Sequence, residues 1–343
     1  MSKKLLYFNL ALDENDTSLG FAIDWIKTIA KNYDHVDVVT LKKVSNLNFQ
    51  ENIKVHGAKP NKYKIYKYVY LFNKVKELTK ENTYDRCFSH MSPISILVSS
   101  YYLKKNKIKS TLWFTHPGPK FGFKKLILFL SFIISEHIVT ASKTSFPIKS
   151  KKVSVIGHAV DLVNFSNKKE EYKLHNFLIL SRISSSKNIE IAIDGFLNSK
   201  FKDRNLDIIG GPLNKNDEVY LSKLMNKYSS NNVNFLGKIN HANLPEVLKN
   251  YDVHFNCAGN GFFDKSVLET LSSEIINFYV NEDFNLLFDD NSYQFNNSKE
   301  LARKLDNLIN LSREEIKNTI HKSKKELQNN SLSSLNSRLE PYL

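Results

Sequence analysis

Short apolar runs alternate with longer amphipathic segments along the whole chain. Runs rich in Val, Ile, Leu and Phe, each about five residues long, are typical of strands buried on both faces of a sheet. The predicted strands cover residues 5–10, 36–41, 86–89, 110–114, 137–140, 152–156, 176–180, 205–209, 233–236, 253–256 and 276–280. The helices predicted between them cover residues 20–32, 64–81, 94–105, 187–197, 217–228, 242–249, 264–273, 298–310 and 312–328. Such alternation predicts an α/β fold of parallel sheets flanked by helices.

The strand–helix rhythm occurs in both halves of the chain, which predicts two domains. A chain of 343 residues has the length of about two ordinary domains. The polar segment 161–173 separates the two halves and is the predicted linker. We therefore expect one domain over residues 1–165 and a second over residues 166–328. The C-terminal segment 329–343 is a candidate to pack back on the first domain.

The composition excludes several classes of protein. With 23 Phe and 16 Tyr, the chain can bury a sizeable core, so it is not a disordered protein. Cys87 and Cys257 lie in different halves, which disfavours a disulfide-stabilised secreted fold. No apolar run approaches the roughly 20 residues of a membrane span. The first residues, MSKKLLYFNLAL, lack a signal-peptide pattern, so we expect a cytoplasmic protein.

The excess positive charge lies entirely in the first half. The formal net charge is +14, and residues 1–165 carry all of it, with 26 basic and 12 acidic side chains. The runs 54–76 and 86–135 contain no acidic residue. One interpretation is a solvated lysine surface. The other is a surface that faces a membrane, a phosphorylated acceptor or nucleic acid.

Candidate binding residues follow the predicted strands of the second half, where parallel sheets bind their ligands. Arg182 and Lys187 come directly after the strand 176–180 and precede a helix. An Arg, a Lys and free helix N–H groups together suit a diphosphate, although a basic loop is more often simply solvated. Glycine turns follow the next two strands, at Gly210, Gly211 and Gly237.

A loop with glycines precedes the helix that starts near residue 264. It reads Gly259-Asn260-Gly261-Phe262-Phe263 and continues into Asp264-Lys265-Ser266-Val267-Leu268-Glu269. The carboxylate of Glu269, in the second helical turn, can accept two hydrogen bonds from a sugar diol. Taken alone, it is more typical of a surface or capping glutamate.

In this order and at these spacings, the segments resemble the GT-B glycosyltransferases, specifically the family 4 retaining enzymes (glycosyl transferases group 1). The matching motifs are Arg182…Lys187, Gly210-Gly211-Pro212, Phe235-Leu236-Gly237 and Val267-Leu268-Glu269. Upstream, the segment 153–161, followed by Phe165, resembles the family's end of its first domain. The resemblance implies two Rossmann-like parallel-sheet domains that face a central cleft. The first would bind the acceptor and the second a nucleotide-sugar.

The resemblance also implies roles for individual residues. Arg182 and Lys187 would hold the donor diphosphate and Glu269 the ribose hydroxyls. Gly20 would bring a helix N-terminus near the same diphosphate. His116 would lie near the donor sugar, and His90 is a weaker candidate for acceptor or donor contact. Sugar transfer would proceed with retention. The donor phosphate itself would help to deprotonate the acceptor, so no dedicated base would be needed. We expect a UDP- or GDP-linked donor as substrate, no cofactor and no metal.

The sequence departs from the family pattern at several positions. The acidic residue that often contacts the donor sugar, eight residues before the ribose-binding Glu, is Gly261 here, and Asp264 and Lys265 are the candidates to replace it. The first glycine loop is reduced to Ser18-Leu19-Gly20, and the segment 270–276 reads TLSSEII instead of the customary motif. These departures leave the identity of the sugar open.

The prediction for the acceptor depends on the basic first half of the chain. The apolar segment 126–134 is interpreted either as a buried helix or, with the lysines before it, as a surface that lies on an anionic bilayer. The Lys- and Tyr-rich segment 62–76 has the same two interpretations. Our hypothesis is a peripheral enzyme on the inner face of the membrane with a lipid-linked, glycolipid or polysaccharide acceptor. The alternatives are a non-catalytic glycosyltransferase-like subunit and a nucleic-acid-binding protein. No recognisable motif supports the latter, so we expect no nucleic acid partner.

Overall fold

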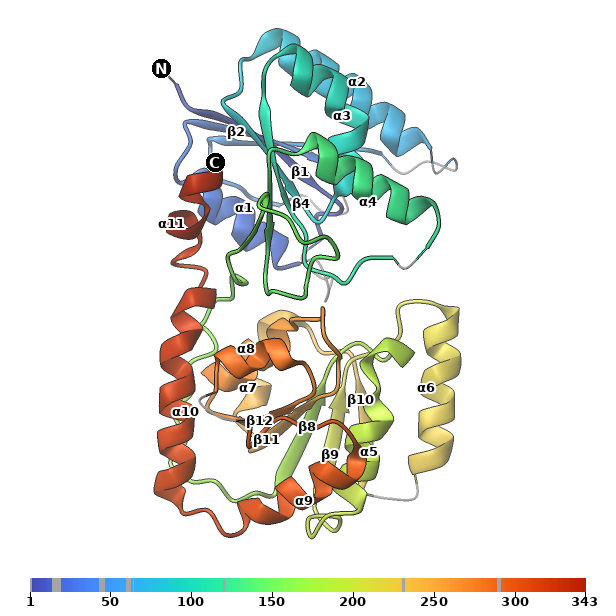
Figure 1. Ribbon diagram of the computed structural model, residues 1–343, viewed down its shortest axis with the longest axis vertical. Helices are drawn as coiled ribbons and strands as arrows, with labels where there is room; N and C mark the ends of the chain where they lie inside the picture. Colours follow the sequence, from blue (N-terminus) through green and yellow to red (C-terminus); the bar gives the residue numbers. More distant parts are fainter. Residues whose placement is uncertain are drawn as a thin grey trace. The chain divides into compact units, whose positions relative to one another are not determined.

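The computed structural model describes residues 2–13, 20–42, 47–59, 63, 65–119, 121–229, 232–288 and 291–343. The chain forms two compact units (Figure 1). Unit 1 consists of Met1–Ala159 and Leu332–Leu343, and unit 2 consists of Val160–Ser331. Each unit contains a parallel sheet covered by helices, so the predicted α/β class is confirmed.

Unit 1 is built on a parallel sheet that, within the described residues, has seven strands in the order β3-β2-β1-β4-β5-β6-β7. The strands are β1 (Lys4–Asn9), β2 (His35–Thr40), β3 (Ile53–Gly57), β4 (Arg86–His90), β5 (Lys109–Trp113), β6 (His137–Thr140) and β7 (Val153–Val155). Strands β1, β2, β4 and β5 are almost wholly buried, which explains the continuous apolar run of β1 (KLLYFN). Strands β2, β4 and β5 also carry polar side chains. Trp25 and Trp113 pack edge to face in the core, with ring centroids 4.7 Å apart.

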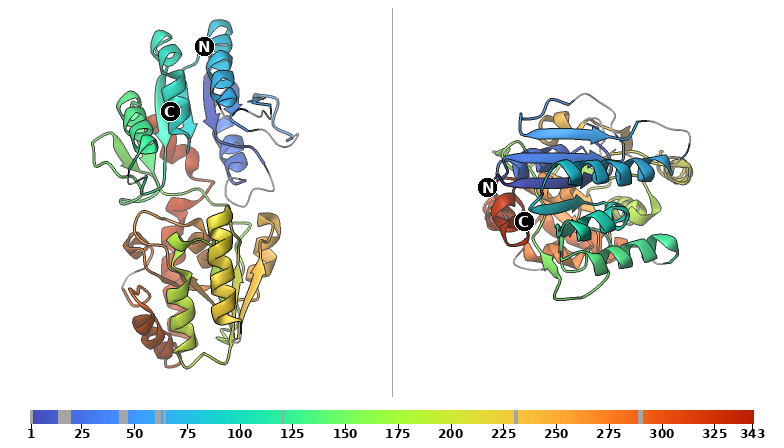
Figure 2. Two further views of the ribbon diagram at one scale, coloured as in Figure 1. Left: turned by 90° about the vertical axis from the view of Figure 1, so that its right-hand side faces the viewer. Right: turned by 90° about the horizontal axis from the view of Figure 1, so that it is seen from above.

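The helices of unit 1 are α1 (Ala22–Ala30), α2 (Tyr66–Glu81), α3 (Pro93–Lys105), α4 (Phe123–Ile134), α11 (Leu335–Leu339) and the 3₁₀ turn η5 (Glu340–Tyr342). Helices α2, α3 and α4 pack side by side in one layer, and α1 packs against α11 (Figure 2). The C-terminal segment is fixed to this unit because Asn336 donates a 2.7 Å hydrogen bond to the Thr28 carbonyl.

One strand of unit 1 does not follow from the sequence pattern. Strand β3 pairs with β2 at the edge of the sheet, and its residues Ile53–Gly57 fall in the basic stretch of the first half. An edge strand is half exposed, so it carries no continuous apolar run. Ile53 and Val55 alternate with Lys54 and His56 instead, and this short segment does not stand out among the lysines around it.

Unit 2 contains a parallel sheet with the strand order β10-β9-β8-β11-β12 among the described residues. The strands are β8 (Asn176–Leu180), β9 (Asn205–Ile209), β10 (Val233–Gly237), β11 (Val253–Asn256) and β12 (Ile276–Tyr279). The order along the chain reverses between β8 and β11. Ligands of open α/β sheets bind beyond the carboxyl ends of the strands at such a reversal.

Helices surround this second sheet (Figure 1). They are α5 (Ile189–Leu197), α6 (Lys215–Tyr228), α7 (Leu244–Leu248), α8 (Lys265–Ser272), α9 (Ser298–Leu308) and α10 (Arg313–Leu327). Short 3₁₀ turns are η1 (Ser185–Lys187), η2 (His241–Asn243), η3 (Glu282–Leu286) and η4 (Gln328–Asn330). The S-x-x-E pattern of Ser312 and Glu315 predicts a capping box at the start of α10, and the structure confirms it.

Candidate functional site

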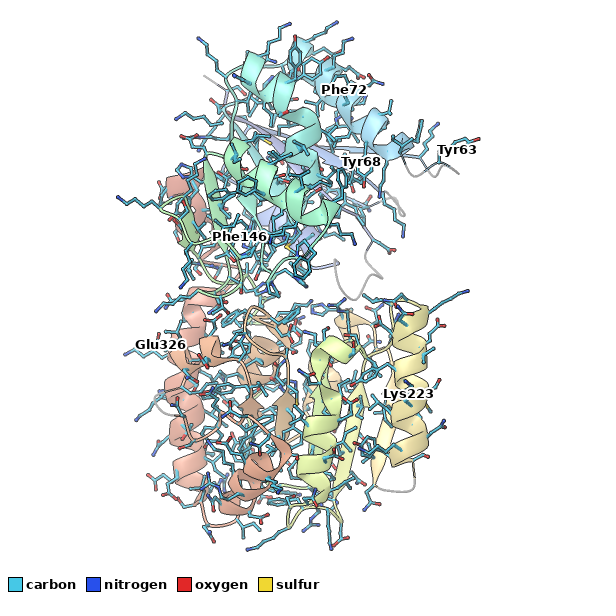
Figure 3. All side chains as sticks on the ribbon, turned by 45° about the vertical axis from the view of Figure 1, so that its right-hand side comes forward. Tyr63, Tyr68, Phe72, Phe146, Lys223 and Glu326 are labelled. Atoms are coloured by element: carbon cyan, nitrogen blue, oxygen red, sulfur yellow. The ribbon has the colours of Figure 1, made fainter. Side chains whose placement is uncertain are left out.

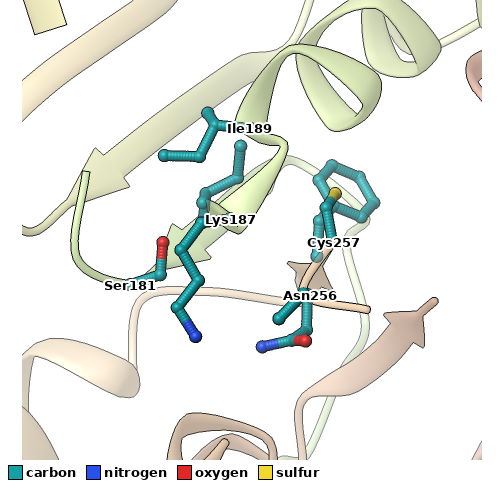
Figure 4. Close-up of a pocket in the computed structure, with 8 residues that line it drawn as sticks. Ser181, Lys187, Ile189, Asn256 and Cys257 are labelled. Atoms are coloured by element: carbon teal, nitrogen blue, oxygen red, sulfur yellow. The ribbon is translucent and has the colours of Figure 1, made fainter. Parts of the chain in front are cut away.

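A small pocket of unit 2 lies at the carboxyl ends of β8 and β11, where the strand order reverses. Its lining includes Ser181, Lys187, Ile189, Asn256 and Cys257 (Figure 4). The chain reaches it by leaving β8 at Leu180, forming η1, and turning into α5 through Asn188, whose φ is 46°. Asn tolerates this left-handed conformation better than most residues, which explains its use where the helix begins.

The ammonium group of Lys187 is the buried cation of this site. The residue is only 5% exposed, and its Nζ lies 2.6 Å from both carboxylate oxygens of Asp264. It also lies 4.9 Å from the ring centroid of Phe262. Asn256 donates a further 3.0 Å hydrogen bond to Asp264 Oδ2. Lys187 at the end of η1 and Asp264 at the start of α8 thus form one ion pair across 77 positions of the sequence.

The charge state of Asp264 follows from these contacts. Burial raises its pKa, but the charge and hydrogen bond of Lys187, the Asn256 amide and the charge of Arg182 outweigh burial, so the pKa is lowered. Arg182 lies partly buried in the loop between β8 and η1. Two cations therefore face one carboxylate, and the N-terminus of α5 begins beside them. The local charge is positive and suits an anion that carries several oxygens.

The predicted glycines hold the neighbouring loops close together. Gly210 has φ 143°, and a Cβ there would lie 1.7 Å from the Ser181 carbonyl oxygen. Its N–H donates a 2.8 Å hydrogen bond to the Gly237 carbonyl, and Ile183 N–H donates to the Gly211 carbonyl at 3.1 Å. Gly237 itself has φ 76°. These residues join the loops that follow β8, β9 and β10, which is a structural reason for their presence.

Glu269 lies buried in α8, with 2% of its surface exposed. His241 Nε2 lies 2.9 Å from Glu269 Oε1, and Lys265 Nζ lies 3.7 Å from the same oxygen. Sequence reasoning does not single out His241, because a lone histidine after a strand carries no motif. Its contact with Glu269 spans 28 positions and becomes visible only when η2 is placed beside α8.

Three of the predicted residues lie in unit 1. Gly20 forms the turn before α1 and accepts a 3.1 Å hydrogen bond from Ile23 N–H, while Ser18 and Leu19 lie outside the described residues. His116 lies in the loop after β5, where its N–H donates to the Ser145 carbonyl at 2.7 Å. Its Nδ1 accepts from Gly118 N–H at 3.2 Å.

His90, the last residue of β4, lies in the aromatic core of unit 1. Its ring stacks on Trp113 with centroids 4.9 Å apart and an interplanar angle of 3°, and Trp25 contacts it edge to face. The residue is 0% exposed. We therefore assign His90 a packing role, and its predicted contact with donor or acceptor stays a prediction.

This burial predicts an acid-sensitive unit 1. Burial, with a contribution from His158, lowers the pKa of the His90 imidazole to about 3. The unfolded chain takes up this proton near pH 6.5, so unit 1 should lose about 3 kcal/mol of stability between roughly pH 6.5 and pH 4. His90→Phe should flatten this dependence. Denaturation at several pH values, monitored by tryptophan fluorescence, measures this pH dependence. The same pH slope in wild type and variant would contradict the assignment.

The described part of the chain contains no group of three or more His, Cys, Asp and Glu side chains placed to hold a metal ion. No described helix is both long and apolar enough to cross a membrane.

Comparisons with known proteins bear on the fold and on the sequence family of unit 2. The sequence model of the family Glycosyl transferases group 1 matches residues 163–326, within unit 2. Anabaena HepE, solved with UDP and glucose, superposes with a TM-score of 0.75 at 14% identity, over 99% of this chain and 98% of that one. A glycosyltransferase from Rickettsia africae superposes with a TM-score of 0.76 at 15% identity and the same coverage. The lipopolysaccharide outer core galactosyltransferase WaaB gives a TM-score of 0.65 at 14% identity, over 99% and 100% of the two chains. A search of curated proteins finds no match.

The chain therefore has the GT-B fold, as the sequence resemblance predicts. The match of residues 163–326 to the glycosyl transferases group 1 family supports a glycosyltransferase.

Proposed function

We propose that this protein is a retaining glycosyltransferase that takes a sugar from a UDP- or GDP-linked donor. The acceptor is a lipid-linked, glycolipid or polysaccharide molecule on the inner face of the membrane. The observation that carries the donor proposal is the pair of cations, Arg182 and Lys187, at the strand reversal of unit 2, with Glu269 on the neighbouring helix α8.

In this proposal the second unit holds the leaving group. Arg182, Lys187 and the N-terminus of α5 bind the diphosphate, and Glu269 accepts hydrogen bonds from the ribose hydroxyls. The bond between the anomeric carbon and the diphosphate oxygen breaks, and its electron pair moves to the diphosphate, whose growing charge the two cations stabilise. The acceptor hydroxyl attacks from the same face, and a diphosphate oxygen takes its proton. His116 stays a predicted catalytic residue of unit 1.

Two structural relatives support a nucleotide-sugar donor. HepE was solved with UDP and glucose, and the pneumococcal O-GlcNAc transferase GtfA with UDP and GlcNAc. GtfA superposes on this chain with a TM-score of 0.71 at 9% identity. WaaB is a lipopolysaccharide outer core galactosyltransferase, which is consistent with a glycolipid acceptor.

A thermal-shift screen against UDP-, GDP- and CMP-sugars tests the donor. A ligand that binds only the folded state raises the melting temperature with its concentration. We expect one UDP- or GDP-sugar to do so, and Arg182→Met to abolish the shift. The matched control is Arg204→Met, which removes an exposed arginine of the same unit. If no nucleotide-sugar shifts the wild-type melting temperature, the donor proposal fails.

His241 should act as a positioning residue for Glu269. His241→Ala removes the 2.9 Å contact to Glu269 Oε1, so we expect the dissociation constant for the nucleotide to rise about tenfold. His241→Gln keeps a hydrogen-bonding group and should recover part of the affinity. The corresponding 2′,3′-dideoxynucleotide has no ribose diol. It should bind wild type and variant equally, and an equal loss with both ligands would contradict a role through Glu269.

A non-catalytic glycosyltransferase-like subunit is the second candidate. Two observations favour it: Asp264 already neutralises Lys187, and Gly261 stands where the family often carries an acid. Such a subunit would bind the nucleotide-sugar weakly or not at all and would not release free nucleotide from it.

A further inference from the structure

Helix α4 of unit 1 exposes an apolar surface. Only Leu128 and Ser131 of its residues are buried, where Leu128 packs with Leu112, Phe114 and Ile138. The side chains exposed on and just before this helix, which we call the α4 face, are Phe121 (85%), Phe123 (74%), Leu126 (49%), Phe129 (48%), Ile133 (52%) and Ile134 (38%). The structure thus decides against a fully buried helix.

Lysines lie at both ends of helix α4. Lys124 and Lys125 are exposed in its first turn, which contains no acidic residue. Cations at a helix N-terminus oppose the helix dipole, so they cost the helix stability. At the other end, Lys152 donates hydrogen bonds to the carbonyls of Ile133 and Ser135, at 3.1 and 3.0 Å. Positive charge therefore lies at both ends of the apolar surface.

We propose that the α4 face is the membrane-docking surface of the protein and that its ligand is an anionic lipid bilayer. This inference deepens the proposed function, since it places the acceptor-side unit on a lipid surface. The exposed aromatic and aliphatic side chains enter the boundary between headgroups and acyl chains. Lys124 and Lys125 contact the anionic headgroups.

Charge is the reason for choosing a bilayer over a second copy of this chain. Helix α4 carries the exposed Lys124 and Lys125 in its first turn and no acidic residue. Two copies that met at this surface would bring like charges together, which opposes association. Helix α2 also exposes apolar side chains, among them Phe72 (Figure 3), but it carries Glu77 and Glu81. The α4 face combines exposed apolar groups with cations alone.

Vesicle sedimentation of the full chain tests the proposal. The probes are vesicles of phosphatidylcholine and phosphatidylglycerol in equal amounts, and vesicles of phosphatidylcholine alone, at low and at physiological salt. We expect binding to the anionic vesicles that weakens with salt. Phe123→Gln/Phe129→Gln should weaken it about tenfold or more. Lys124→Glu/Lys125→Glu should do the same at low salt.

Helix α6 of unit 2 offers matched controls for each variant. Val219 and Met225 are 57% and 43% exposed on α6, so Val219→Gln/Met225→Gln removes comparable apolar surface. Lys215 lies in the first turn of α6 and Lys223 points outward from it (Figure 3), so Lys215→Glu/Lys223→Glu repeats the charge change. Both controls should sediment with the vesicles as the wild type does.

The proposal is overturned if wild type stays in the supernatant with anionic vesicles at low salt, or if the α4 variants bind as strongly as wild type. It is also overturned if the α4 variants instead dissociate a dimer or release a copurifying acidic protein. The nucleotide-induced thermal shift of every variant separates the two claims. A preserved shift with no vesicle binding rejects only the docking surface. Vesicle binding without any nucleotide shift rejects only the donor proposal.

Discussion

Replacing Lys187 by methionine is expected to weaken nucleotide binding about 100-fold and to lower the stability of unit 2 by about 3 kcal/mol. The methionine keeps the length of the side chain but removes the cation that lies 2.6 Å from both oxygens of Asp264. A carboxylate that is mostly buried then loses its main partner. A donor diphosphate loses a buried positive charge, which corresponds to an affinity loss of about 100-fold.

A second substitution separates these two effects. Asp264→Asn in the Lys187→Met background removes the unpaired carboxylate, so most of the stability should return while nucleotide binding stays weakened. A double-mutant cycle of unfolding free energies, with Asp264→Asn alone as the fourth corner, measures the coupling. If stability and binding return together, Lys187 acts only through the fold and not on the donor.

Gly210→Ala is expected to destabilise unit 2 by about 3 kcal/mol or more. The φ of 143° is almost exclusive to glycine, and the new Cβ would lie 1.7 Å from the Ser181 carbonyl oxygen. Relief requires β9 or the loop after β8 to move, and that loop carries Arg182. Nucleotide binding should therefore weaken together with stability.

Two other glycines of the same unit calibrate this effect. Gly237→Ala meets no atom within 4 Å but has φ 76°, so it should cost about 1 kcal/mol. Gly259→Ala has open space and an ordinary φ, and it should be close to neutral. Circular dichroism during denaturation reports both units, whereas Trp25 and Trp113 report unit 1 alone. The loss of stability measured from the ellipticity should be largest for the Gly210 variant, smaller for the Gly237 variant and smallest for the Gly259 variant. Equal losses of stability at all three positions would contradict the geometry.

Most of the fold follows from the sequence because the strands of both sheets are buried. Buried parallel strands are mostly apolar, so β8 (NFLIL) stands out as a continuous run. The bounds of β9 (NLDII) and β11 (VHFN) are also predicted as observed, although both strands carry polar side chains. The edge strand β3 is half exposed, so it has no continuous apolar run and is not predicted. The apolar segment of α4 predicts a helix, but composition alone does not tell which face its neighbours cover, and the exposure of Phe123 and Phe129 needs the structure.

The candidate site follows from the sequence in its parts but not in its contacts. Strand ends and motif order predict Arg182, Lys187 and Glu269 as a group. The pairing of Lys187 with Asp264 spans 77 positions, and that of His241 with Glu269 spans 28. Such contacts depend on which loops meet at the edge of the sheet, which periodicity does not encode. His90 shows the converse, since a histidine at a strand end looks available for a ligand until its aromatic neighbours are known.

The most direct test of the central claim is a calorimetric titration with UDP and with GDP. It uses the wild-type chain and the Lys187→Met/Asp264→Asn variant, whose fold the double substitution should largely restore. The account predicts saturable binding of one nucleotide diphosphate to the wild type, with one site per chain, and a loss of about 100-fold in the variant. Equal affinity in wild type and variant, or no binding of either nucleotide to the wild type, would contradict it.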